Sequence, residues 1–342
     1  MHPCSRAWCI CAMLCVPLLG FYGTFGRQIG GGTSNSTQPI FDSILMSGDP
    51  PTAKRMPVMG FGTCCRKSAK GPPLIASTLE YLSQGGRLID TAQMYQNHRD
   101  LKVAIQRSGV PREQLWVTSK VMTVRGELQG KLKGGALKAA TVRQVEKILE
   151  ELGLEYIDLL LLHHAMNNGP EERAWQFRGL LAAKERGLVR HCGVSNFDRR
   201  QIEALKEATG ALPAVNQLEF HPYVLPETFE LVSWCQASGI AVTAYGSLGS
   251  SKTGGKAGEG VSAVASRHGV TSAAVLLRWA LSKGCAVIPG ATSAIHIFEN
   301  LHPKPFVLTA EDEDSIRRKA PPSSWRFWNN MAKEDGSPLK KS

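Results

Sequence analysis

Residues 156–162 read YIDLLLL, a near-continuous apolar run that is followed by His163 and His164. A strand has this composition when both of its faces are covered, as in a parallel sheet between layers of helices. The preceding stretch, residues 141–152, reads TVRQVEKILEEL, and its apolar residues recur along one helical stripe. The two segments form one helix–strand unit, the repeating element of α/β folds.

Similar units recur along the chain. The predicted strands are Val58–Thr63, Arg87–Asp90, Leu115–Lys120, Ile157–His163, Val189–Ser195, Ala214–Glu219, Ala241–Tyr245 and Ala286–Pro289. Helical patterns lie between them, including Leu74–Gln84, Thr141–Leu152, Arg173–Arg186 and Asp198–Ala208. Eight such units predict an α/β fold of the (β/α)8 TIM-barrel type. A doubly wound sheet is the alternative, but no G-x-G-x-x-G follows the first predicted strand.

The composition fits one large folded domain with short additions. The chain has 342 residues, of which 43% are hydrophobic and 20% charged, so wholesale disorder is excluded. The net charge of +11 is spread along the chain. Because no basic helix, aromatic platform or known module accompanies it, we expect no nucleic-acid partner.

We divide the chain into a leader and linker (1–40), a barrel (41–320) and a tail (321–342). Residues 41–57, FDSILMSGDPPTAKRMP, predict a β-hairpin in front of the barrel, around the Gly-Asp-Pro-Pro turn. The apolar run at about residues 7–25 is typical of a signal-peptide core or an anchor. An extended or mis-assigned start without a targeting role is the alternative.

The cysteines give no metal or redox motif. Four of the nine lie in the first fifteen residues, and the others are Cys64, Cys65, Cys192, Cys235 and Cys285. No C-x-x-C pair occurs, so we expect these five to be free, buried thiols in a reduced compartment.

Polar residues end several predicted strands. They are Asp90, Lys120, His163, Ser195 with Asn196, Gln217 and Tyr245. Barrel enzymes build their active sites at the carboxyl ends of the strands, so this convergence predicts an active site.

Three of these residues, together with the nearby Tyr95, suggest proton donation to a carbonyl group. The phenol of Tyr95 is a poor acid at neutral pH unless a cation stabilises the phenolate. Lys120 supplies such a cation, Asp90 holds the ammonium, and His163 orients the substrate oxygen.

Several long motifs, in order, resemble the aldo-keto reductase family. They are MPVMGFGT (56–63), LIDTAQMYQN (88–97), WVTSKV (116–121), GLEYIDLLLLHH (153–164), GLVRHCGVSNF (187–197), AVNQLEFHPY (214–223), TAYGSLG (243–249) and VIPGATSAIHIFENL (287–301). The resemblance implies hydride transfer from a nicotinamide cofactor to an aldehyde or ketone, an alcohol dehydrogenase or carbonyl reductase activity. It assigns Asp90, Tyr95, Lys120 and His163 as the catalytic four.

The resemblance also implies a cofactor site and a substrate pocket. Ser195, Asn196 and Gln217 match residues that hold the carboxamide, and Tyr245 matches the aromatic residue that stacks on the nicotinamide. The remaining expected cofactor contacts are Gly62, Thr63, Ser247, Leu248, Gly249, Pro289, Thr292, Ser293, His296, Glu299 and Asn300. Expected pocket residues are His164 and Met94. An N-cap role for Ser195 and Asn196 is compatible with this assignment. We expect no metal, because the His163–His164 doublet lacks a third ligand.

The last motif departs from the family at the 2′-phosphate. The family commonly has lysine, serine and arginine where this chain has Gly290, Ala291 and His296. The loss of two cations weakens phosphate recognition, which Thr292, Ser293 and His296 compensate in part. NADPH is the expected cofactor, with NADH as the rival.

Three further segments differ from the family or vary within it. The segment VRGELQGKLKGGALK (124–138) is unusually long and carries +3, which steers acidic substrates unless it is a solvated surface loop. The loop SSKTGGKAGEG (250–260) is too short for a belt over the cofactor. The tail SSWRFWNNM (323–331) is expected near the pocket.

The expected partner is a small-molecule carbonyl substrate, with no stable membrane contact apart from the leader. The family resemblance implies a cytoplasmic monomer. The alternative function is a non-catalytic relative, a binding or channel-associated subunit built on the same barrel.

Overall fold

The computed structural model describes residues 42–122, 132–165, 168–249 and 258–318. Eight parallel strands follow one another in spatial order. They are β3 (Gly60–Gly62), β4 (Leu88–Asp90), β5 (Trp116–Val121), β6 (Ile157–Leu162), β7 (Val189–Ser195), β8 (Val215–Glu219), β9 (Ala241–Tyr245) and β10 (Ala286–Val287). A bridge between Met59 and Val287 joins the last strand to the first. The predicted barrel is confirmed.

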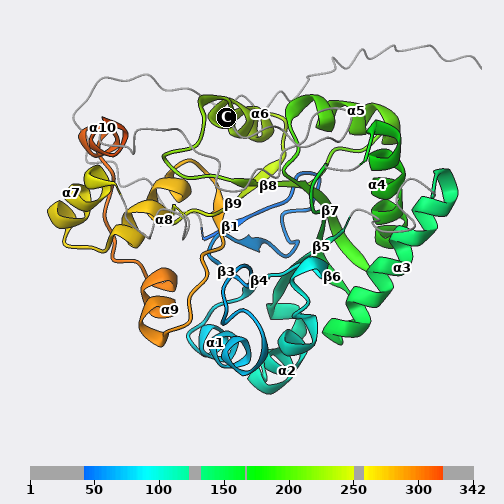
Figure 1. Ribbon diagram of the computed structural model, residues 1–342, viewed down its shortest axis with the longest axis horizontal. Coiled ribbons are helices and arrows are strands. Elements are labelled where there is room, and N and C mark those ends of the chain that lie inside the picture. The colour runs from blue at the N-terminus through cyan, green and yellow to red at the C-terminus, as the bar shows by residue number, and fades with distance from the viewer. Residues whose placement is uncertain (1–41, 123–131, 166–167, 250–257, 319–342) are drawn as a thin grey trace, which may run out of the picture. The chain divides into compact units, whose positions relative to one another are not determined.

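Helices lie around the ring of strands (Figure 1). They are α1 (Gly71–Ser83), α2 (His98–Ser108), α3 (Gly134–Leu152), α4 (Pro170–Glu185), α5 (Arg199–Thr209), α6 (Pro226–Ala237), α7 (Glu259–His268), α8 (Ser272–Ser282), α9 (Ala294–Leu301) and α10 (Ala310–Arg318). Short 3₁₀ turns, η1 (Gln93–Tyr95) and η2 (Arg112–Gln114), precede α2 and β5. No helix of the described residues has the length and apolar character needed to cross a bilayer.

Several element boundaries differ from the prediction by one or more residues, and two of these differences have a clear physical reason. Helix α3 begins at Gly134, seven residues before the predicted start, so Gly134–Lys138 of the long segment are helical. Strand β10 ends at Val287 rather than at Pro289. Proline has no N–H for the ladder, but its carbonyl still accepts a hydrogen bond from the Gly62 N–H at 3.1 Å.

The predicted hairpin is present and packs against the amino-terminal end of the barrel. Its strands β1 (Ser43–Ile44) and β2 (Met56–Pro57) are antiparallel. Met46 and Met56 are buried in one apolar cluster with inward-facing strand residues such as Trp116, Leu159 and Leu161. This cluster fills the barrel interior, while a larger one packs the helices onto the outer face of the strands.

A buried carboxylate ties this hairpin to the barrel. Asp158 of β6 lies 2.6 Å from Lys54 Nζ and 2.7 Å from Arg112 Nη2. It also accepts a hydrogen bond from the Val117 N–H at 2.9 Å. Both oxygens of Asp158 are therefore satisfied, and its charge is balanced by two cations.

Replacing Asp158 by alanine leaves Lys54 and Arg112 without their counter-charge. We expect unfolding free energy to fall by about 3 kcal/mol, the lower end for buried pairs, because both cations keep some contact with solvent. Denaturant unfolding followed by circular dichroism measures this loss. The matched control is Asp314→Ala, which breaks an exposed pair with Arg318 and is expected to cost less than about 1 kcal/mol. Equal effects of the two substitutions contradict the prediction.

One expectation about the cysteines is wrong. Cys64 and Cys65, in the loop after β3, form a disulfide between neighbours. Their adjacency brings the two sulfurs together once Cys65 takes a left-handed backbone conformation, with φ of 69°. Cys192, Cys235 and Cys285 are free and buried as expected. Burial raises the pKa of the Cys192 and Cys285 thiols to about 12, so they are unreactive at neutral pH.

Candidate active site

The centre of the site is an ion pair between the ends of β4 and β5. Lys120 Nζ lies 2.6 Å from Asp90 Oδ1 and donates to the Thr91 carbonyl at 3.0 Å. Only 1% of Lys120 and 2% of Asp90 are exposed. Burial lowers the pKa of Lys120, and the neighbouring Asp90 carboxylate acts against this shift. The pair is held rigidly and shielded from solvent.

Tyr95, in the turn η1 after β4, lies over this pair. Lys120 Nζ is 5.2 Å from the centre of the Tyr95 ring, and the ring meets that of His163 edge-on at 5.7 Å. The structure therefore brings the four expected catalytic residues together.

The pKa of Tyr95 moves in the direction opposite to the one expected from its cation. Burial, and then the negative charge of Asp90, raise the pKa of Tyr95 well above 10. Lys120 does not outweigh these two effects, because Asp90 offsets part of its charge at 2.6 Å, although the ammonium still lies 5.2 Å from the centre of the Tyr95 ring. Tyr95 therefore stays protonated, which suits a group that donates a proton during reduction.

Three of the expected carboxamide contacts are linked at the next strand ends. Ser195 Oγ donates to the Gln217 carbonyl at 2.8 Å, and Asn196 Nδ2 donates to Ser195 Oγ at 2.9 Å. Asn196 also donates to the His163 carbonyl at 3.1 Å and accepts from the Tyr245 hydroxyl at 2.7 Å. Gln217 Nε2 donates to Asp90 Oδ2 at 2.8 Å, which connects this cluster to the ion pair.

The N-cap role for Ser195 and Asn196 is wrong. Asp198 caps α5, since its side chain accepts from the Gln201 N–H at 2.8 Å and Gln201 returns a bond to the Asp198 N–H. Asn196 instead has a left-handed backbone, with φ of 62°. Its side chain is thereby turned toward His163 and Tyr245 rather than toward the helix.

The other expected cofactor contacts lie along the rim formed by the first and last strands. Thr63 Oγ1 donates to the Asp90 carbonyl at 2.9 Å, and Ser247 Oγ donates to that of Ala244 at 3.0 Å. Ser293 caps α9, the helix that carries His296, Glu299 and Asn300. Leu248 is partly buried against the core, and Gly249 follows it with φ of 77°. Thr292 Oγ1 lies 3.0 Å from Ser68 Oγ, so the first and last loops touch.

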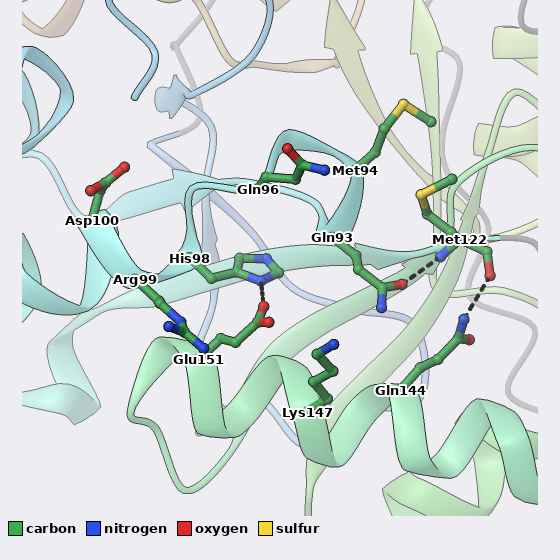
Figure 2. Close-up of a pocket in the computed structure, with 10 residues that line it drawn as sticks. All are labelled: Gln93, Met94, Gln96, His98, Arg99, Asp100, Met122, Gln144, Lys147 and Glu151. Carbon is green, nitrogen blue, oxygen red and sulfur yellow. Dashed lines mark hydrogen bonds and ion pairs between the residues drawn. The ribbon is translucent and has the colours of Figure 1, made fainter. Parts of the chain in front are cut away.

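The two expected pocket residues lie in different places. His164 is buried, with its ring 5.8 Å from that of His163. Met94 lines a cavity of about 860 Å³ between η1, α2 and α3, whereas none of the four expected catalytic residues lines it (Figure 2). Within that wall, Gln93 Oε1 accepts from the Met122 N–H at 3.2 Å.

Asn97 is a positioning residue that the sequence analysis missed. It is buried, accepts from Thr91 Oγ1 at 2.7 Å, and donates to the carbonyls of Thr63 at 2.9 Å and Ala69 at 3.1 Å. It ties the loop after β3 to the loop that carries Tyr95. The only sequence signal was its place at the end of the motif LIDTAQMYQN.

Some expectations fall outside the described residues. This group comprises residues 1–40, most of the loop 250–260, the tail 323–331, and residues 123–131 of the long segment, which include Arg125, Glu127 and Lys131. Within the described ranges, no three His, Cys, Asp or Glu side chains are grouped so as to hold a metal ion.

Comparison with known proteins finds consistent relatives. The sequence pattern of the Aldo/keto reductase family matches residues 74–321. The methylglyoxal reductase DkgB of Escherichia coli O157:H7 is 33% identical over 262 residues, covering 76% of this chain and 92% of the relative. Aldo-keto reductase family 1 member A1 of Rattus norvegicus is 32% identical over 318 residues, covering 83% and 92%. The solved structure of a Bombyx mori aldo-keto reductase in complex with NADP superposes with a TM-score of 0.67 at 28% identity, covering 78% and 89%.

Proposed function

The chain belongs to the aldo/keto reductase family, and from this premise we propose that it reduces an aldehyde or ketone to the alcohol with NADPH. The observation that carries the proposal is the position of Tyr95, which lies over the buried Lys120–Asp90 pair and against His163. A binding subunit built on the same barrel needs no proton donor, so turnover with a carbonyl compound distinguishes the two functions.

Each of the four residues has a distinct task. Tyr95 gives its hydroxyl proton to the carbonyl oxygen as that oxygen gains negative charge, so the O–H bond of Tyr95 breaks and the alcohol O–H forms. Lys120 then lies beside the phenolate and stabilises it, and the proton is restored from solvent. Asp90 fixes the ammonium, and His163 donates a hydrogen bond that orients the substrate oxygen.

The residues present fit a nicotinamide dinucleotide. Polar side chains lie at the ends of the adjacent strands β7 and β8, linked to the Lys120–Asp90 pair. They are the amides of Gln217 and Asn196 and the hydroxyl of Ser195. At the same rim, in the loop after β3, the guanidinium of Arg66 has two buried nitrogens without a hydrogen-bond partner, which suits an anionic ligand. When bound, the cofactor supplies the hydride, and the protein's contribution is binding and orientation.

The substrate is proposed to be a small uncharged or weakly acidic carbonyl compound. Relatives include an enzyme named for methylglyoxal reduction, and methylglyoxal is a small carbonyl compound. We further propose, from the family resemblance, that the chain acts as a monomer in the cytoplasm.

The test is a cofactor-oxidation assay with the purified full-length chain. Consumption of NADPH is expected with an activated aromatic aldehyde or methylglyoxal, and no consumption without a carbonyl compound. Binding of NADPH is followed in parallel by quenching of tryptophan fluorescence. A chain that binds NADPH but is inert across a broad panel of aldehydes and ketones is a binding subunit, and the proposal is then wrong.

A further inference from the structure

Arg66, three residues after Thr63 in the loop that follows β3, reaches across to the last loop of the barrel. Its Nη1 donates to the Gly62 carbonyl at 3.2 Å. A Cβ atom added at Gly290 would lie 1.5 Å from Arg66 Nη1 and 2.6 Å from its Cζ. The guanidinium therefore occupies the space in which a side chain at position 290 would begin.

The charge of Arg66 has no counter-charge in the part of the chain that the structure describes. Its Nε and Nη2 atoms are buried without an acceptor, and no described carboxylate forms an ion pair with it. Burial without a compensating anion lowers the pKa of the guanidinium. Such a cation is costly to keep unless a ligand brings negative charge to it.

The surroundings of Arg66 favour a phosphate group. Ser68, on the same loop, meets Thr292 at 3.0 Å between their hydroxyl oxygens. Helix α9 begins immediately afterwards, at Ala294, behind its cap Ser293. Phosphate sites of (β/α)8 barrels commonly lie between the loops after the last strands and the N-terminus of a short additional helix.

These observations, taken with the proposed function on which the inference rests, lead to one assignment. We propose that Arg66 is the specificity-determining residue that recognises the 2′-phosphate of NADPH, reaching from the first loop into the space left by Gly290. Gly290 and His296 leave the last loop without the lysine and arginine that the family commonly places there. Arg66 restores one of these cations from a segment 224 residues earlier in the chain.

The test compares binding of NADPH and NADH, each measured by fluorescence quenching at two ionic strengths. In Arg66→Ala we expect the dissociation constant for NADPH to rise about 10- to 100-fold, as for a lost charge-assisted contact, with little change for NADH. The salt dependence of NADPH binding is expected to weaken. Competition with 2′-AMP and 5′-AMP separates the 2′-phosphate from the pyrophosphate.

Three further variants isolate the guanidinium. Gly290→Ala keeps the Arg66 charge but displaces the guanidinium, because the new Cβ occupies the same space. This variant is expected to weaken the binding of NADPH but not that of NADH. Arg66→Ala combined with Gly290→Lys returns a cation from the last loop and is expected to recover NADPH affinity. Arg186→Ala removes an exposed charge at the end of α4, just before β7, and is the matched control.

The outcomes separate the inference from the proposed function. If Arg66→Ala weakens the binding of NADPH and NADH equally, or the binding of 5′-AMP as much as that of 2′-AMP, Arg66 contacts the pyrophosphate and the inference is overturned. No change in any dissociation constant also overturns it. In both cases carbonyl-dependent turnover of the wild type still supports the reductase. A wild type that binds neither dinucleotide overturns both. All variants are checked for unchanged melting temperature, in buffers with and without a thiol reductant to fix the state of Cys64–Cys65.

Discussion

Replacing Tyr95 by phenylalanine is expected to lower the turnover of carbonyl reduction by about 10²- to 10⁴-fold, the range of a positioned general acid. The substitution removes the hydroxyl and keeps the ring, which packs against His163 and over Lys120. Dinucleotide affinity and melting temperature are therefore expected to stay at their wild-type values. Steady-state kinetics with one aldehyde, beside fluorescence titration of NADPH, measure both quantities.

The pH dependence of the wild type is a second measurement of the same residue. Reduction requires the protonated phenol, so activity falls as pH rises through the pKa of Tyr95 in the folded protein. Because burial and Asp90 raise that pKa well above 10, no loss due to Tyr95 is expected between pH 7 and about 10. A loss of reductive turnover with an apparent pKa near 8 contradicts a donor that stays protonated over this range. NADPH binding to Tyr95→Phe, measured over the same pH range, shows whether such a loss arises from binding instead.

Replacing Lys120 by methionine is expected to affect both turnover and stability. The methionine fills the space of the lysine stem, but Asp90 keeps a buried charge whose remaining side-chain partner is Gln217. Breaking a buried pair in this way costs about 3–5 kcal/mol of unfolding free energy. Turnover is expected to fall by at least about 10²-fold, because nothing then stabilises the Tyr95 phenolate.

A double variant separates these two effects. Asp90→Asn combined with Lys120→Met removes both charges, and the asparagine oxygen still accepts from Gln217. Most of the lost stability is expected to return, whereas turnover stays low. Denaturant unfolding and steady-state kinetics are compared across the wild type, both single variants and the double variant. Recovery of turnover together with stability shows that Lys120 acts only through folding, and the proton-donation mechanism is then wrong.

The fold was predictable because its signal is local and repeated. Buried parallel strands such as 157–162 must be apolar on both faces, and the helices beside them carry an apolar stripe of helical period. Each helix–strand unit can therefore be predicted from its own residues. The errors lie at boundaries. The prediction missed the start of helix α3 at Gly134, because its first two residues are glycines, which are poor helix formers.

The proximity of Asp90, Tyr95, Lys120 and His163 was also predictable, because a parallel barrel brings the carboxyl ends of its strands, and the loops that follow them, to one rim. Their electrostatics were not. Whether Lys120 lowers the pKa of Tyr95 depends on how completely Asp90 neutralises the ammonium and how far the ring is buried. These distances and exposed fractions depend on the tertiary structure and cannot be obtained from the spacing of residues along the chain.

The sequence by itself determined the barrel, the hairpin before it and the residues that meet at its rim, since periodicity and strand ends are local properties of the chain. The resemblance to the family further indicated that Gly290 and His296 stand where a lysine and an arginine are common. Only the tertiary structure decided what stands in their place. Arg66 and Gly290 are 224 residues apart. Barrel closure between the first and last strands brings this guanidinium, which has no carboxylate partner among the described residues, against a residue that has no side chain to exclude it.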